Sequence, residues 1–130
     1  MNAELMLRKV CPDFDAWPDR WQIMSGDRKC GLELLAFFRP FGEDLINGGL
    51  AKSTIRRHLT NVWILGGELI RIVNEDEKLR GCSAKDLIMK YVGEDGGPYC
   101  RHLESGADRN AFDATCRKLH KFLGKEKGGE

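Results

Sequence analysis

The sequence predicts a single all-α domain, a small bundle of about four to five helices. The chain has 130 residues, which is enough for one hydrophobic core and too few for two domains of ordinary size. Apolar residues recur every three or four positions in several segments, as one buried helix face requires. Helix start and stop signals flank these segments. We expect a helical domain over residues 27–124, an irregular aromatic arm over 1–26 and a disordered tail over 125–130.

The predicted arm contains two prolines and three large aromatic residues. Pro12 and Pro18 interrupt regular structure, and Phe14, Trp17 and Trp21 supply apolar rings. We expect this segment to be irregular or to form one-turn helices, with its rings holding it against the core.

The first long helix is predicted from about Arg28 to Asn47. Its apolar positions are Leu34, Leu35, Phe38, Phe41, Leu45 and Ile46. Pro40 has no amide hydrogen and clashes with the preceding turn, so a kink or break is expected near Phe38–Arg39. Gly48 and Gly49 end the helix in the manner of a left-handed cap.

The clearest helix is predicted from Thr54 to Asn74, with Ser53 capping its start. Its apolar seam consists of Ile55, Leu59, Val62, Gly66, Leu69 and Val73. A continuous helix of this length extends about 30 Å. A glycine inside a helix costs about 1 kcal/mol, so Gly66 predicts either close packing of a neighbour or a bend.

Two further helices are predicted in the second half of the chain. One begins with a capping box from Ser83 to Asp86 and ends at Gly93. The other begins at Asp108, which can cap it. The apolar face of this last helix consists of Phe112, Cys116, Leu119, Phe122 and Leu123.

The composition is that of a soluble globular protein, with 42% hydrophobic and 32% charged residues. No apolar run approaches the roughly 18 residues that a membrane span requires, and the first residues lack the pattern of a secretory signal. We therefore expect a cytoplasmic protein without a membrane partner. The five cysteines are odd in number, far apart and without a Cys-x-x-Cys pair, which predicts reduced thiols.

Four residues near the end of the chain have side chains that can bind zinc: Cys100, His102, Cys116 and His120. Their spacing matches no zinc pattern that we can justify, and Cys116 already belongs to an apolar face. No Walker loop, dinucleotide fingerprint or nucleophile elbow occurs, and nothing near the cysteines indicates an activated thiolate. We expect no metal, no cofactor and no catalytic activity.

The net charge of +1 is unevenly distributed. Residues 51–71 contain four Lys or Arg against one Asp or Glu, and residues 109–130 contain six against three. Both basic segments are predicted helices. The last helix carries Arg109, Arg117, Lys118, Lys121 and Lys125. We include Lys118 and Lys121 among the expected DNA contacts, while the alternative is that lysines near a helix end favour the dipole and solubility.

The first basic segment places seven polar or basic residues in the opening turns of the long helix. They are Lys52, Ser53, Thr54, Arg56, Arg57, Thr60 and Asn61. Arginine matches phosphate or guanine, asparagine pairs with adenine, and hydroxyls with backbone amides hold phosphate at a helix start. Cations at this end oppose the helix dipole, which favours the arrival of an external anion. The alternative is a solvated face beside a core stripe.

The stretch GLAKSTIRRHLTNVWILGGELI resembles the SAM-like N-terminal core-binding domain of tyrosine recombinases and phage integrases. The resemblance extends over Leu32–Val73 in helix order and is carried by a small residue and a threonine before a hydrophobic and basic helix start. It implies a helical bundle that clasps duplex DNA in a mobile element or recombination system. The catalytic domain of that family has no counterpart, and Tyr91 and Tyr99 are not in the setting of its nucleophilic tyrosine. The resemblance implies the DNA-clasping half, with a separately encoded recombinase or another protein as partner.

The same residues also resemble a winged helix-turn-helix. EDLINGG corresponds to the supporting helix, LAKSTIRRHLTNV to the recognition helix and ELIRIVNEDEKLRG to a wing hairpin. Ile70, Ile72 and Val73 are β-branched and suit a strand. The unbroken seam through Gly66 favours one long helix instead. Both resemblances imply duplex DNA as the partner.

A helical protein-interaction adaptor or oligomer without nucleic-acid affinity is the competing interpretation. Trp17, Trp21 and Trp63 are more tryptophans than a domain of this size needs. Any that is exposed would mark a hydrophobic docking surface, although each one singly is typical of a core. The oligomeric state and the DNA sequence bound are open at this stage.

Overall fold

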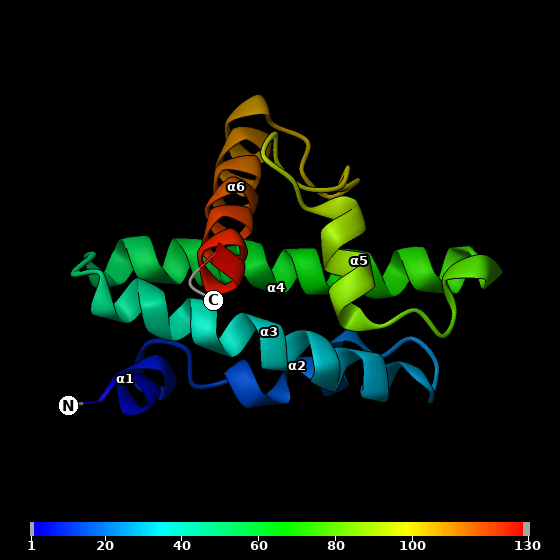
Figure 1. Ribbon diagram of the computed structural model, residues 1–130, viewed down its shortest axis with the longest axis horizontal. Helices are drawn as coiled ribbons and strands as arrows, with labels where there is room; N and C mark the ends of the chain where they lie inside the picture. Colours follow the sequence, from blue (N-terminus) through cyan, green and yellow to red (C-terminus); the bar gives the residue numbers. More distant parts are fainter. Residues whose placement is uncertain (1, 129–130) are drawn as a thin grey trace.

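The computed structural model describes residues 2–128, with side chains through Lys125. These residues form one all-α domain of six helices. The α-helices are α1 (Ala3–Val10), α2 (Trp17–Trp21), α3 (Asp27–Asn47), α4 (Lys52–Glu75), α5 (Ala84–Tyr91) and α6 (Gly106–Gly128), and the 3-10 turns are η1 (Phe14–Ala16) and η2 (Glu77–Leu79). The long helices α3 and α4 run side by side in opposite directions (Figure 1). The short helices α1 and α2 pack along α3, while α6 crosses α4 and α5 packs on α3.

The N-terminal segment is more regular than the irregular arm expected for residues 1–26. Asn2 caps α1, because its Oδ1 accepts a hydrogen bond of 2.9 Å from the amide of Leu5. Phe14, Trp17 and Trp21 are all buried members of the main hydrophobic core. The segment is therefore built into the same core as the helices that follow it.

Helix α3 continues through Pro40, so the break expected near Phe38–Arg39 does not occur. Pro40 is exposed, while Phe38 and Phe41 on either side of it are fully buried. We attribute the continuity to these buried rings, which fix the backbone on both sides of the missing amide hydrogen bond. The helix ends as expected, with Gly49 at a φ of +75°.

Helix α4 is continuous from Lys52 to Glu75, as the apolar seam predicted. This overturns the winged helix-turn-helix alternative, because the residues assigned to the first strand of its wing lie inside the helix. The prediction for Ser53 was also wrong: Ala51 occupies the cap position, and no side chain accepts a bond there. The helix starts two residues earlier than expected, at Lys52, after the extended cap residue Ala51.

Gly66 permits the close packing that its place in the seam predicted. A Cβ atom at this position would overlap the indole ring of Trp21. The same indole donates a hydrogen bond of 2.9 Å from Nε1 to the carbonyl oxygen of Trp63. Trp21 thus joins α2 to the middle of α4 by both packing and a hydrogen bond.

The last two helices begin with serine caps. Ser83 caps α5 as predicted, since its Oγ accepts from the amide of Asp86 at 3.1 Å. For α6 the cap is Ser105, which accepts from the amide of Asp108 at 3.0 Å, so the expectation that Asp108 caps this helix was wrong.

Helix α6 reaches Gly128. The predicted disordered tail is therefore helical over 125–128, and positions 129–130 lie outside the described residues. None of the helices in the described part of the chain is long and apolar enough to cross a membrane.

Candidate nucleic-acid interface

The start of α4 presents cations without an acid of its own. No acidic residue lies in its first turn. The exposed residues of this stretch are Lys52, Ser53, Arg56, Arg57 and Thr60, and Thr54 is half-buried. The positive end of the helix dipole therefore has no compensating carboxylate in the first turn.

Most arginines in the described part of the chain pair with carboxylates. Those in ion pairs are Arg8, Arg28, Arg39, Arg71, Arg101 and Arg109. Among described residues, Arg56 and Arg57 have no such partner, and neither do Lys118 and Lys121 on α6, which are exposed. These four cations are thus open to an external anion.

Helix α6 brings the second basic segment onto the first. The hydroxyl of Thr115 lies 2.9 Å from Nδ1 of His58 and accepts a bond of 2.9 Å from Nδ2 of Asn61. Because this hydroxyl also donates to the carbonyl of Ala111 at 3.2 Å, we assign the proton of the imidazole to Nδ1. A threonine of α6 therefore holds the first half of α4 through two side chains.

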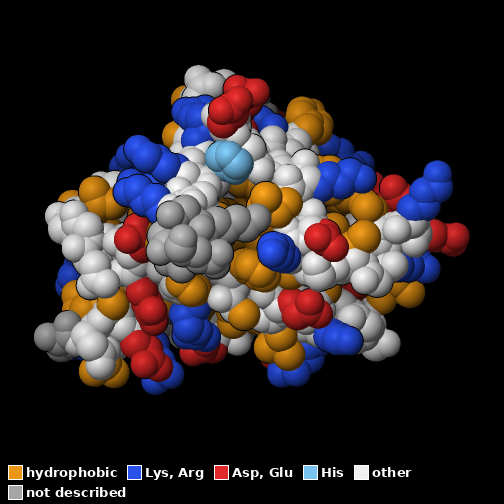
Figure 2. Space-filling model, in the orientation of Figure 1, with side chains coloured by type: hydrophobic (Ala, Val, Ile, Leu, Met, Phe, Trp, Pro, Cys, Tyr) orange, Lys and Arg blue, Asp and Glu red, His pale blue; other side chains and the backbone are white. Residues whose placement is uncertain are grey.

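Lys118 lies one helical turn after Thr115, whose hydroxyl contacts His58, and Arg57 precedes His58 in the chain, so both positive charges act on the pKa of this imidazole. The pKa of His58 is lowered from the usual value of 6.5 by burial and then by the positive charges of Lys118 and Arg57. Two residues from basic segments far apart in the sequence thus flank one imidazole. Figure 2 shows Lys and Arg side chains beside α6, over the first half of α4. We call Arg57, Lys118 and Lys121 the basic face, with Lys121 one helical turn beyond Lys118.

Asn61 does not contribute to this surface. It is 8% exposed, and its amide also donates to the carbonyl oxygen of Ala111 at 3.3 Å. The sequence prediction that it contacts DNA is therefore replaced by a structural role, which arises because position 61 faces α6. Thr115 was not among the predicted site residues. The only sequence feature that could have indicated it is a polar residue between the apolar positions Phe112 and Leu119.

The remaining predicted residues divide between two sides of α4. Arg57 acts electrostatically on His58, which contacts Thr115 of α6, whereas Arg56 and Thr60 line a pocket that α4 forms with the N-terminal segment. Consecutive helical positions differ by about 100° in direction, so Arg56 and Arg57 cannot share one face. The pocket also includes Trp63 and Arg20. Arg20 was not among the residues predicted to bind a ligand.

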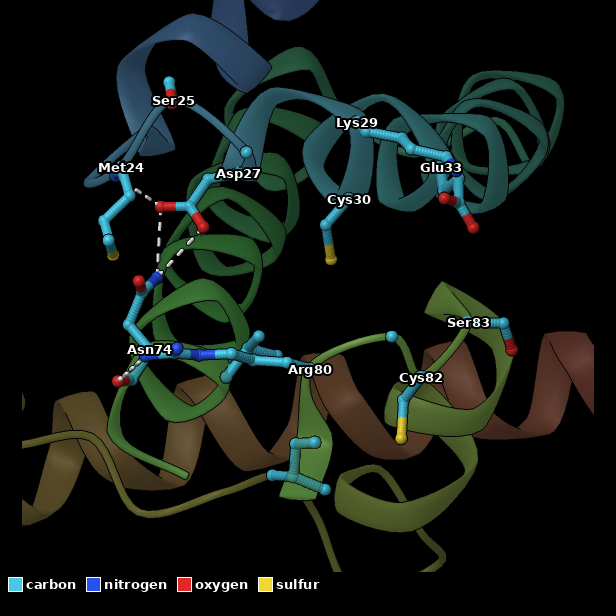
Figure 3. Close-up of a pocket in the computed structure, with 14 residues that line it drawn as sticks. Met24, Ser25, Asp27, Lys29, Cys30, Glu33, Asn74, Arg80, Cys82 and Ser83 are labelled. Atoms are coloured by element: carbon cyan, nitrogen blue, oxygen red, sulfur yellow. Dashed lines mark hydrogen bonds between the residues drawn. The ribbon is translucent and has the colours of Figure 1, made fainter. Parts of the chain in front are cut away.

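Another pocket, of about 500 Å³, lies between the start of α3, the end of α4 and the loop before α5 (Figure 3). In it, Asp27 accepts hydrogen bonds from the amides of Ile23 and Met24 and from Nδ2 of Asn74. These bonds occupy the carboxylate in joining α4 to the α2–α3 connection. None of the predicted DNA contacts lies here.

The two buried thiols are poor nucleophiles at neutral pH. Burial raises the pKa of Cys116 to about 12 and that of Cys100 to about 11. Of the four possible zinc ligands, these two cysteines are buried and His102 is exposed. In the described residues no three His, Cys, Asp or Glu side chains are grouped so that they could hold a metal ion.

Comparisons with protein families, with curated proteins and with solved structures found no match to this chain. The fold class therefore rests on the helices themselves, and the function rests on the chemistry of the exposed side chains.

Proposed function

We propose that the protein is a cytoplasmic, non-catalytic domain that binds duplex DNA through the basic face. The observation that carries the proposal is the convergence of Arg57 and Lys118 beside His58, both exposed and without a carboxylate partner among the described residues. Lysine and arginine that neutralise phosphates release counterions from DNA, which makes such a surface favourable for binding. Lys52, Ser53 and Thr54 at the start of α4 extend it toward further phosphate contacts.

The SAM-like resemblance supports a role in a recombination system. A bundle whose long helix carries the basic cluster is compatible with the DNA-clasping half of a recombinase. This assignment is part of the proposal and depends on DNA binding.

The test is a titration of fluorescently labelled duplex DNA at several salt concentrations. The double variant Arg57→Ala/Lys118→Ala should weaken binding and lower the slope of log K against log salt by about 2, because each phosphate contact contributes about 0.9. The matched control is Lys78→Ala/Lys85→Ala, which removes the same charge from exposed lysines of η2 and α5. Equal effects of both pairs, or no duplex binding at low salt, would contradict the proposal.

A protein-interaction role has one specific observation in its favour. Ile23 and Met24 are adjacent apolar residues in the connection between α2 and α3, and they are 60% and 55% exposed. If the protein is an adaptor, Ile23→Ser/Met24→Ser should abolish its association with a partner protein. Neither this variant nor the unchanged protein should then bind labelled duplex DNA above the signal of buffer alone.

A further inference from the structure

The pocket beside Arg56 has a volume of about 440 Å³ and walls from two parts of the chain. Helix α4 supplies Arg56, Thr60 and Trp63, which lie one helical turn apart along one side of the helix. Facing them are Arg20 of α2 and Asp13, which precedes η1. A cavity of this size accommodates one small organic ligand.

Trp63 is the tryptophan that this pocket leaves open to solvent. Its exposed fraction is 41%, while Trp17 and Trp21 are buried in the core. The bond from Nε1 of Trp21 to the carbonyl oxygen of Trp63 fixes the backbone at this position. The pocket therefore has an aromatic surface on a rigid support, available for stacking against a planar ring.

The charges around the ring favour an anionic ligand. Arg20 and Arg56 are exposed, and within the described chain neither pairs with a carboxylate. The carboxylate of Asp13 accepts a hydrogen bond of 3.3 Å from the thiol of Cys11 and has spare capacity as an acceptor. The pocket thus offers two guanidinium groups, an exposed indole and one carboxylate acceptor.

We propose that this pocket binds an unpaired nucleotide of DNA. The base stacks on Trp63, and Arg20 and Arg56 bind the phosphates. Asp13 accepts a hydrogen bond from an amino group of the base. This inference rests on the proposed function, because Arg56 of the pocket is next in sequence to Arg57 of the basic face and the pocket would hold a nucleotide that leaves the bound duplex. A phosphotyrosine side chain supplies a ring and a phosphate but no ring amino group for Asp13, so a nucleotide is the better match.

The experiment compares a blunt duplex with the same duplex carrying a short single-stranded cytidine overhang. We expect the overhang to bind about tenfold more tightly, because stacking of one base on an aromatic side chain contributes about that factor. Overhang binding should also quench tryptophan fluorescence. Trp63→Ala should remove both the preference and the quenching, while binding of the blunt duplex persists.

Neighbouring arginines provide a matched control. Arg56→Ala should reduce the overhang preference, whereas Arg57→Ala, on the other side of α4, should weaken both DNA forms equally. Trp63→Phe keeps a ring in place and should retain part of the preference, which separates loss of stacking from loss of the fold. Asp13→Asn should reduce the advantage of a cytidine over a thymidine overhang, because thymine has no amino group.

The outcomes separate this inference from the proposed function. Duplex binding without an overhang preference, or a preference that survives Trp63→Ala, overturns the nucleotide pocket and leaves the basic face intact. Quenching of Trp63 by single-stranded oligonucleotide without duplex binding supports the pocket and overturns the proposed function. Equal displacement of the oligonucleotide by a phosphotyrosine peptide also overturns the nucleotide assignment.

Discussion

Gly66 and Trp21 show how one residue pair determines the relation between two helices. The indole of Trp21 fills the space that a side chain at position 66 would occupy, and its Nε1 bonds to the backbone one turn earlier on α4. Helix α2, which contributes Arg20 to the proposed nucleotide pocket, is therefore held at a set distance from α4.

We expect Gly66→Ala to lower the free energy of unfolding by about 2 kcal/mol, because the added methyl forces the indole out of its place. The matched control is Gly124→Ala in α6, where a Cβ meets no neighbouring atom within 4 Å. That change should raise stability by up to about 1 kcal/mol through helix propensity. Urea unfolding of the two variants measures both effects, and a neutral Gly66→Ala would show that Trp21 is free to move.

His58 makes stability depend on pH. Its pKa in the folded state is lowered by burial and by Lys118 and Arg57, so the unfolded chain binds its proton more readily. The associated stability is present above the unfolded pKa of about 6.5 and is lost as pH falls toward the folded pKa. His58→Gln should flatten this part of the pH dependence in urea unfolding. Identical pH profiles for the two proteins would exclude the effect.

Side-chain caps are present at the start of some helices and absent at others. Ser83 and Ser105 each accept a bond from an amide in the first turn of a helix, whereas α4 begins without a side-chain cap. The start of α4 thus combines unpaired amides with cations, an arrangement that an incoming phosphate would relieve.

Two serine variants test this difference between helices. We expect Ser83→Ala to lower the free energy of unfolding by about 1 kcal/mol, because it leaves the Asp86 amide unpaired. Ser53→Ala should change stability little, since no cap bond involves Ser53. Thermal and urea unfolding give the comparison, and a larger loss at Ser53 would mean that α4 is capped after all.

The packing of α6 on α4 determines which cations lie together on the surface of the molecule. Thr115 bonds to His58 and Asn61, and the cations Arg57 and Lys118 flank this contact. The basic face therefore depends on a polar junction between two helices that are far apart in the sequence.

We expect Thr115→Val to lower the free energy of unfolding by about 2 kcal/mol, because Asn61 and His58 lose a buried partner. The same change should weaken duplex DNA binding, since Lys118 is no longer held beside Arg57. Thr115→Ser keeps the hydroxyl and should preserve both properties. Unfolding and DNA titration of the two variants check this, and loss of stability without any change in DNA affinity would uncouple the junction from binding.

The sequence alone determined the all-α class and the position of most of the longer helices, but not the regular α1 helix or the first residues of α4 and α6. Spacing of apolar residues located α3, α4 and the later helices, and the glycine turn and Ser83 cap were read correctly, because these signals depend on neighbours within one or two turns. Local reasoning failed at Pro40, where buried rings on either side outweigh the helix-breaking residue.

Only the tertiary structure decided which polar residues belong to the candidate site. It turned Asn61 inward against Thr115, separated Arg56 from Arg57, and joined the two basic segments around His58. The physical reason is that helix periodicity identifies the face a residue lies on, but not which distant element covers that face. Packing of α6 and α2 against α4 supplies this information, and it arises only when the core assembles.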